Sequence, residues 1–211
     1  MFRLGVLGTK GGCGKSTSAT SLAVAIHQLG LSVLLVDIDP QGSTASWGQR
    51  RRRTPPVVSS TSTGLSDLLR RAESANYDIV VVDGAAHDKR ALVLAARLVD
   101  LSIICAAPTL PDIEVCMRDR DCIAANPSSV LLTKTPHTFS RRLAAWHRAA
   151  SASGSVVNSM FGNRVDFQDA FASGFGVTEW APSSPAAQEV RAAASWILEH
   201  IKEVSYEAQT A

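Results

Sequence analysis

The stretch GTKGGCGKST, residues 8–17, decides the fold, because it joins a short apolar run to a helix-like run. It has the character of a phosphate-binding loop, in which glycines let the backbone wrap around phosphates and a Lys-Ser pair opens a helix. Its spacing departs from the ordinary pattern G-x-x-x-x-G-K-[ST], because Thr9 stands where the first glycine belongs. A second lysine, Lys10, precedes two glycines. The loop therefore predicts a nucleotide site with an additional cation.

Strand-like and helix-like runs alternate along the rest of the chain. Continuous apolar runs occupy residues 2–8, 32–39, 77–84, 101–108 and 129–134. Helical patterns occupy 15–29 and about 186–203. Apolar strands separated by helices indicate a mostly parallel, twisted sheet with helices on both faces, here the single-domain P-loop NTPase fold. We expect one domain over 1–204, a loop with at most a short strand at 50–63, and a frayed tail at 205–211.

The bulk composition favours a cytoplasmic globular protein. The chain has 211 residues, is 45% hydrophobic and carries a formal net charge of +2. No apolar run reaches the length of a membrane span, and the phosphate loop begins too early to leave room for a signal peptide. The four cysteines, Cys13, Cys105, Cys116 and Cys122, are interpreted as free thiols. An iron–sulfur cluster bridged by Cys105 and Cys116 is the alternative.

The loop residues can be assigned chemical roles. Lys15 is expected to reach the β- and γ-phosphates, and the Ser16 hydroxyl to bind Mg²⁺. Glycines let backbone N–H groups approach, and Cys13 contributes mainly its own N–H. Predicted nucleotide-binding residues are Lys10, Gly11, Gly12, Cys13, Gly14, Lys15, Ser16 and Thr17, with Pro108, Thr133 and Lys134 as candidate base or ribose contacts. A purely structural glycine turn is the alternative.

Five segments carry a resemblance to a known family. The form KGGxGK[ST] resembles the deviant Walker A motif of the ParA/MinD family of P-loop ATPases. VDIDPQGS (36–43) is similar to its second motif and VVVDGAA (80–86) to its Walker B strand. Weaker similarities follow at 106–112 and 131–135, so that the resemblance runs from residue 3 to about 200.

The resemblance implies a catalytic arrangement for ATP and Mg²⁺. It implies that Lys10 crosses the interface of an ATP-sandwiched homodimer and touches the partner's nucleotide. Asp39 would orient the attacking water, and Asp37 and Asp83 would hold the Mg²⁺ shell together with Ser16. The implied catalytic residues are Lys10, Lys15 and Asp39.

The resemblance also implies a switch between two states. In the family the ATP dimer binds a surface, and hydrolysis releases it. The chain ends IKEVSYEAQTA, too short and polar for a membrane helix. With no helix-turn-helix segment ahead of the loop, it resembles the small ParA type. We therefore expect a nucleoid-associated partition ATPase that binds DNA without sequence preference and answers to a ParB-like centromere-binding partner.

Three other functions remain open at this point. A ParA-like positioner of a protein cargo, such as a chemotaxis cluster or microcompartment, shares all the motifs. A metallochaperone or reductase of the same superfamily would need metal-binding cysteines. A regulatory binding module would carry a dead site.

Two basic clusters are candidates for DNA contact. The first comprises Arg141, Arg142 and Arg148 at helical spacing, with Arg164 in a following loop. Such a row could face phosphates. The second is Arg50–Arg53. A solvated basic face, or pairing with acidic side chains, is the alternative for both.

Overall fold

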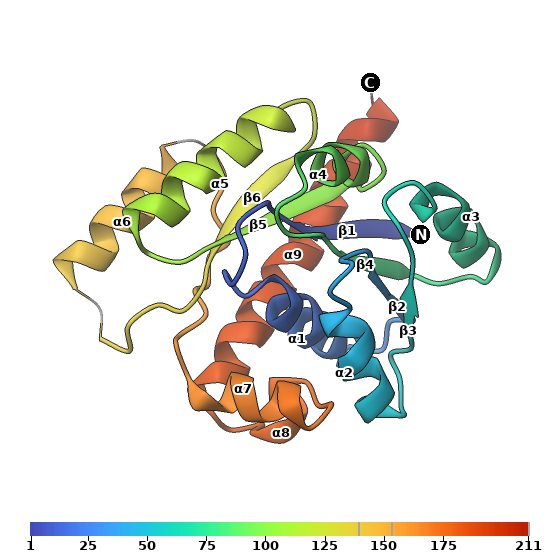
Figure 1. The fold of residues 1–211 in the computed structure, drawn as a ribbon, viewed down its shortest axis with the longest axis horizontal. Helices are drawn as coiled ribbons and strands as arrows, with labels where there is room; N and C mark the ends of the chain where they lie inside the picture. Colours follow the sequence, from blue (N-terminus) through green and yellow to red (C-terminus); the bar gives the residue numbers. More distant parts are fainter. Residues whose placement is uncertain (139, 153, 211) are drawn as a thin grey trace.

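A single parallel sheet forms the centre of the molecule (Figure 1). The structure, a computed structural model, describes residues 1–138, 140–152 and 154–210, with side chains as far as Ile201. The strands are β1 (Phe2–Leu7), β2 (Val33–Asp37), β3 (Val57–Ser59), β4 (Ile79–Asp83), β5 (Leu101–Ala106) and β6 (Ser128–Leu132). Their order is β3-β2-β4-β1-β5-β6, and every pair is parallel. This confirms the predicted fold class.

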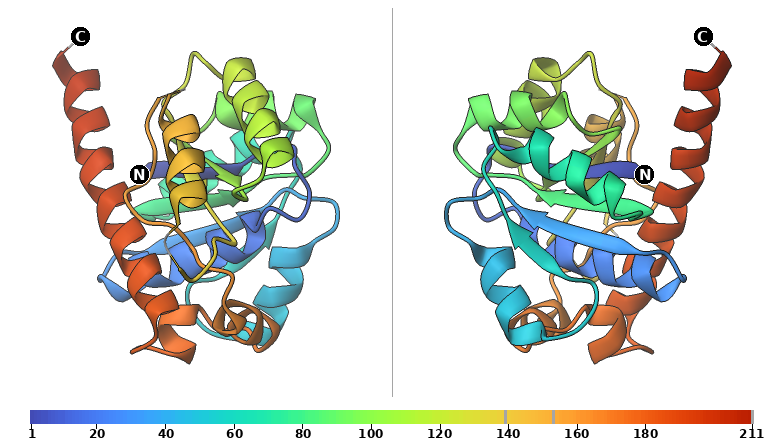
Figure 2. Two further views of the ribbon diagram at one scale, coloured as in Figure 1. Left: turned by 90° about the vertical axis from the view of Figure 1, so that its left-hand side faces the viewer. Right: turned by 90° about the vertical axis from the view of Figure 1, so that its right-hand side faces the viewer.

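Helices cover both faces of the sheet, as Figures 1 and 2 show. One face carries α1 (Lys15–Gln28), α2 (Ser43–Arg51), α7 (Val165–Ala172), α8 (Val177–Trp180) and α9 (Pro185–Thr210). The other carries α3 (Leu65–Ser74), α4 (Lys89–Ala96), α5 (Leu110–Cys122) and α6 (Arg141–Ser151). The sheet therefore separates two apolar cores. Apart from the edge strand β3, its strands are buried on both sides, which is why they read as continuous apolar runs.

The sheet register gathers the chemistry at one edge. Asp37 at the end of β2 aligns with Asp83 at the end of β4. The phosphate loop leaves the end of β1, which is the other neighbour of β4. Carboxyl ends of parallel strands share one edge, so the loop and both acids converge there.

Some elements differ from the sequence expectations. The segment 50–63 holds a short strand, as expected, but also the end of α2, whose Trp47 is fully buried. The last helix continues to Thr210 instead of ending near 203, so residues 205–210 are helical, and Ala211 lies outside the described residues. None of the helices within the described ranges has the length and apolar character needed to cross a bilayer.

Cys105 and Cys116 lie on opposite faces of the sheet. Cys105 packs into the core beneath α1, whereas Cys116 packs into the core on the opposite face of the sheet. Within the described ranges, no cluster of three or more metal-ligating side chains occurs. This placement gives no support to a cluster bridged by the two within one chain.

Candidate functional site

The phosphate loop leads into the N-terminus of α1 and leaves its first backbone N–H groups accessible. Gly14 has φ +91°, a backbone conformation that side-chain-bearing residues rarely adopt, so a glycine is required there. Since Gly14 has no side chain to cap the helix, the first-turn N–H groups remain available to an anion. Lys15 is buried, and its Nζ donates to the Lys10 carbonyl at 2.8 Å. The backbone of the loop thus holds the Lys15 side chain at the N-terminus of α1.

Asp83 lies next to this lysine with one oxygen unsatisfied. Its carboxylate is fully buried, and Oδ2 accepts from the Thr44 hydroxyl at 2.7 Å. Its Oδ1 has no hydrogen-bond partner among the described residues. Burial raises the pKa of the Asp83 carboxyl to about 7, although the hydroxyl groups of Thr44 and Ser16 act to lower it. A buried carboxylate with an orphaned oxygen beside Ser16 fits a divalent cation, whose charge would compensate for the lost hydration.

Asp37 and Asp39 are positioned by backbone N–H groups. Asp37 accepts from Ala45 N at 2.7 Å and from Asp39 N at 3.0 Å, while burial raises the pKa of its carboxyl. Because both its oxygens are already occupied, Asp37 fits a role in an outer shell of a cation. The half-buried Asp39 accepts from Gln41 N at 2.9 Å and from Ala86 N at 3.1 Å, and it faces the cavity of the phosphate loop.

That cavity is large enough for a nucleotide. Its volume is about 580 Å³, in the range of small-molecule sites. Its lining includes Gly11, Gly12, Gly14, Lys15, Ser16, Thr17, Asp39 and Lys134. A smaller cavity of about 80 Å³ adjoins it and includes Thr133, Lys134, Phe161 and Arg164 in its walls. The buried Thr133 hydroxyl donates to the Cys13 carbonyl at 2.6 Å, which ties β6 to the loop. Pro108 lines neither cavity, and its predicted contact stays a prediction.

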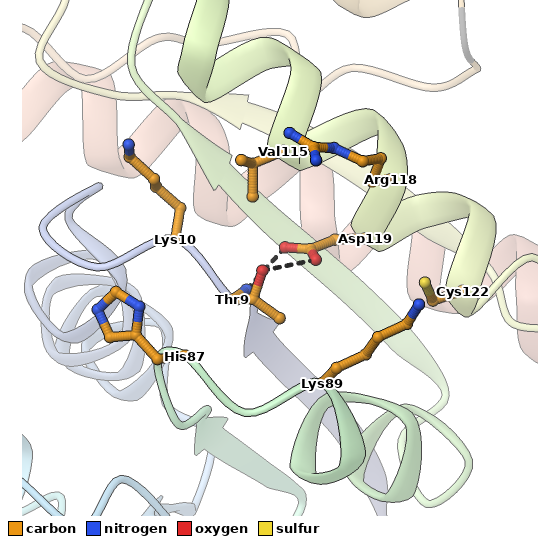
Figure 3. A pocket seen from close by; sticks show the side chains of 8 residues that line it. All are labelled: Thr9, Lys10, His87, Lys89, Val115, Arg118, Asp119 and Cys122. Carbon is orange, nitrogen blue, oxygen red and sulfur yellow. Dashed lines mark hydrogen bonds between the residues drawn. The ribbon is translucent and has the colours of Figure 1, made fainter.

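Lys10 faces a different space. It lines a pocket of about 560 Å³ on the other side of the loop, shown in Figure 3, together with residues of α4 and α5. It is absent from the lining of the 580 Å³ cavity. The two lysines of one loop thus line two different cavities, which share only His87 among the residues that line them. The predicted partner contact of Lys10 stays a prediction.

Two residues that the sequence did not indicate hold the loop from outside. His87 donates its backbone N–H to the Thr9 carbonyl at 2.8 Å. Its ring lies so close to Gly11 that a Cβ there would fall 2.5 Å from Nε2. Asp119 of α5 accepts from Thr9 N at 2.7 Å and from Thr9 Oγ1 at 2.8 Å. A separation of 110 residues between Thr9 and Asp119 leaves no local signal for this contact.

The arginines proposed for DNA contact fall into different environments. Arg141, Arg142 and Arg148 are exposed on α6. Arg164 instead forms an ion pair with Glu189 at 2.7 Å, beside the smaller cavity. The structure therefore brings three of the four together.

The Arg50–Arg53 cluster is partly committed to packing. The buried Arg51 pairs with Glu179 at 2.8 Å and stacks over Trp47. Arg53 stacks over Phe175 with its guanidinium carbon 4.3 Å from the ring centroid.

The sheet is parallel, a glycine loop enters α1, and two acids end neighbouring strands. Together these features define a P-loop nucleotide-binding protein. The sequence profile of the CobQ/CobB/MinD/ParA nucleotide binding domain matches residues 4–164, and the chain belongs to this family. This confirms the family resemblance.

Individual relatives share parts of the chain. It is 37% identical over 113 residues to maintenance of carboxysome distribution protein A of Gloeobacter kilaueensis, covering 52% of this chain and 51% of that protein. It is 48% identical over 52 residues to chromosome-partitioning ATPase Soj of Thermus thermophilus, covering 24% and 21%. The chain therefore spans about half the length of the first relative and about a fifth of the second.

The fold has a solved counterpart. The septum site-determining protein MinD of Pyrococcus horikoshii, complexed with Mg-ADP, superposes with a TM-score of 0.75. The alignment covers 93% of this chain and 95% of that one at 16% identity. At 16% identity, this similarity shows that the two proteins share a fold.

Proposed function

We propose that this chain is a Mg²⁺-dependent ATPase whose ATP-bound dimer positions a cargo along DNA and whose hydrolysis resets it. The proposal rests on one observation, which is that the two lysines of the phosphate loop line different cavities. Lys15 faces the cavity of its own chain, whereas Lys10 faces away from it. A cation that its own site does not use is available to a second copy bound face to face.

The residues at the sheet edge support this chemistry. Bound Mg²⁺ would neutralise phosphate charge, with Ser16 and the free oxygen of Asp83 as its holders and Asp37 behind them. Lys15 would leave the Lys10 carbonyl for the phosphates. Asp39, fixed by two backbone N–H groups, would orient the attacking water. Asp37, Asp39 and Asp83 are already held by hydrogen bonds, so that hydrolysis would depend mainly on positioning.

A protein assembly is the cargo that the relatives favour. The matched carboxysome distribution proteins of two organisms support a microcompartment-like cargo. The exposed arginines of α6 supply a candidate surface for non-specific DNA. The second candidate, partition of DNA with a ParB-like partner, is favoured by the match to Soj.

Light scattering on a sizing column tests the dimer. With Mg-ATP we expect a dimer, and with Mg-ADP a monomer. Lys10→Ala should stay monomeric with Mg-ATP while binding a fluorescent ATP analogue with nearly unchanged affinity. Arg90→Ala, an exposed cation outside both hollows, is the matched control and should dimerise normally. An undiminished dimer in Lys10→Ala would contradict the proposal.

The cargo is tested through the partner. The product of the neighbouring gene should co-purify with the chain and raise its ATPase rate in the presence of DNA. If that product recognises a defined DNA sequence, the cargo is DNA. If it binds a protein assembly and no DNA, the cargo is that assembly.

A further inference from the structure

The pocket that contains Lys10 is walled by three segments that are distant in sequence. In Figure 3, Thr9 and Lys10 come from the phosphate loop, and His87 and Lys89 from the segment that enters α4. Helix α5 contributes Val115, Arg118, Asp119 and Cys122, a spacing that places all four on one helix face. The pocket is therefore built between loop and helices, and it adjoins the nucleotide cavity at His87, which lines both.

The lining is cationic with an apolar wall. Lys10, Lys89 and Arg118 each bring a positive charge. Within the described ranges, none of the three forms an ion pair with a carboxylate, and Arg118 Nε donates only to the Glu114 carbonyl at 3.3 Å. Asp119 is the one acid in the lining, and both its oxygens are taken by Thr9. The positive charge of the pocket is thus not neutralised by an acidic side chain of its own lining.

We propose that this pocket binds an acidic segment of a protein partner, with carboxylates on its cations and an apolar side chain against Val115 and Cys122. The volume of about 560 Å³ accommodates a few side chains. A DNA duplex is a rod with phosphates on its outside, suited to an exposed row such as the arginines of α6 and not to a hollow between helices. Val115 and Cys122 offer a phosphate no polar contact, whereas an apolar side chain of a peptide could pack against them.

A ligand bound in the pocket would contact the residues that hold the phosphate loop in place. Its floor is the Thr9–Asp119 pair, and His87 touches Gly11. Resting on the proposed function, the bound segment would also engage Lys10, the cation that the dimer needs. The pocket therefore suits a partner that holds the chain in its monomeric state.

Fluorescence anisotropy with the nucleotide-free protein tests the pocket independently of ATP. The probe is a labelled oligo-glutamate peptide interrupted by leucines, with the oligo-lysine counterpart as its control. The combined variant Lys89→Glu, Arg118→Glu should weaken binding of the acidic peptide by about tenfold or more. The same change at the neighbouring exposed Arg90, outside the pocket, should alter it less than about twofold. Lys89→Arg should retain binding.

Three results would overturn the proposal. An equal loss in Arg90→Glu would reduce the effect to general surface charge. Full displacement of the peptide by millimolar inorganic phosphate would make the pocket a simple anion site. Tight binding of duplex DNA that disappears in the combined variant would make it a nucleic-acid site. In a separate sizing experiment the peptide should lower the amount of Mg-ATP dimer; if wild type forms no dimer at all, the proposed function fails while the anisotropy result still decides the pocket.

Discussion

The contact between Thr9 and Asp119 offers a quantitative test of how the phosphate loop is anchored. The side chain of Asp119 belongs to a residue only 5% exposed, and it accepts two hydrogen bonds from Thr9, at 2.7 and 2.8 Å. Hydrogen bonds to a charged group contribute about 1.5 kcal/mol each at the low end, so the pair contributes about 3 kcal/mol. Relief of carboxylate desolvation offsets part of this, and Asp119→Ala should lower the free energy of unfolding by about 2 kcal/mol.

Two further variants separate the bonds. Asp119→Asn keeps an oxygen for Thr9 N–H, and its amide can donate to the Thr9 hydroxyl, so it should cost less than about 1 kcal/mol. Thr9→Val removes only the hydroxyl bond and should cost about 1.5 kcal/mol. Combined with Asp119→Ala it should cost clearly less than the sum of the two, because the partner is already gone.

Urea unfolding of the nucleotide-free protein, followed by tryptophan fluorescence, measures these differences. The reasoning is refuted if Asp119→Ala changes the free energy of unfolding by less than about 0.5 kcal/mol, or if the two substitutions add. A loop anchored as we describe should also bind the fluorescent ATP analogue more weakly in Asp119→Ala than in Asp119→Asn.

Three other outcomes are expected. Asp39→Ala should bind ATP normally and remain a dimer on DNA, and loss of nucleotide affinity would contradict its assigned role in orienting water. The charge reversals Arg141→Glu and Arg148→Glu should weaken DNA binding for all sequences and flatten its salt dependence, measured by titration of a labelled duplex at several salt concentrations. Burial works to raise the pKa of the Glu179 carboxyl, but hydrogen bonds from Arg51 and a backbone N–H outweigh it and hold the pKa below its ordinary value of 4.5. The stability that this pair adds over Glu179→Gln should therefore be complete at neutral pH and disappear as the pH falls through the lowered pKa, as acid-denaturation curves of the two proteins would show.

The sheet could be predicted from the sequence because its strands are covered on both faces. Such strands are apolar at nearly every position, and runs such as residues 79–82 show this without reference to the rest of the chain. The phosphate loop could be predicted for a similar reason, because its glycines, lysines and hydroxyls lie next to one another in sequence.

Helix α2 could not be predicted in this way. In its sequence STASWGQRR only Ala45 and Trp47 are apolar, and its stability comes from contacts with distant segments. Trp47 donates its indole N–H to the Phe175 carbonyl at 3.1 Å, and the buried Arg51 pairs with Glu179. A run of arginines resembles a solvated face in sequence, and only the tertiary structure shows that one of them is internal.

The floor of the Lys10 pocket escaped prediction for the same reason. Asp119 lies in a helix among other charged residues, and nothing nearby distinguishes it. Its partner is reached only through the packing of α5 on β5, the strand next to β1. Contacts that depend on two elements distant in the chain leave no periodic pattern.

The distribution of the cysteines gives the chain a built-in attachment point for a dye. Cys13, Cys105 and Cys116 are buried, and burial raises the pKa of each thiol, so that little reactive thiolate forms at neutral pH. Cys122 alone among the four is partly accessible, and it sits in the wall beside Arg118. A maleimide fluorophore should therefore attach there without any engineering of the sequence, and its emission would report in real time whatever enters the hollow next to it.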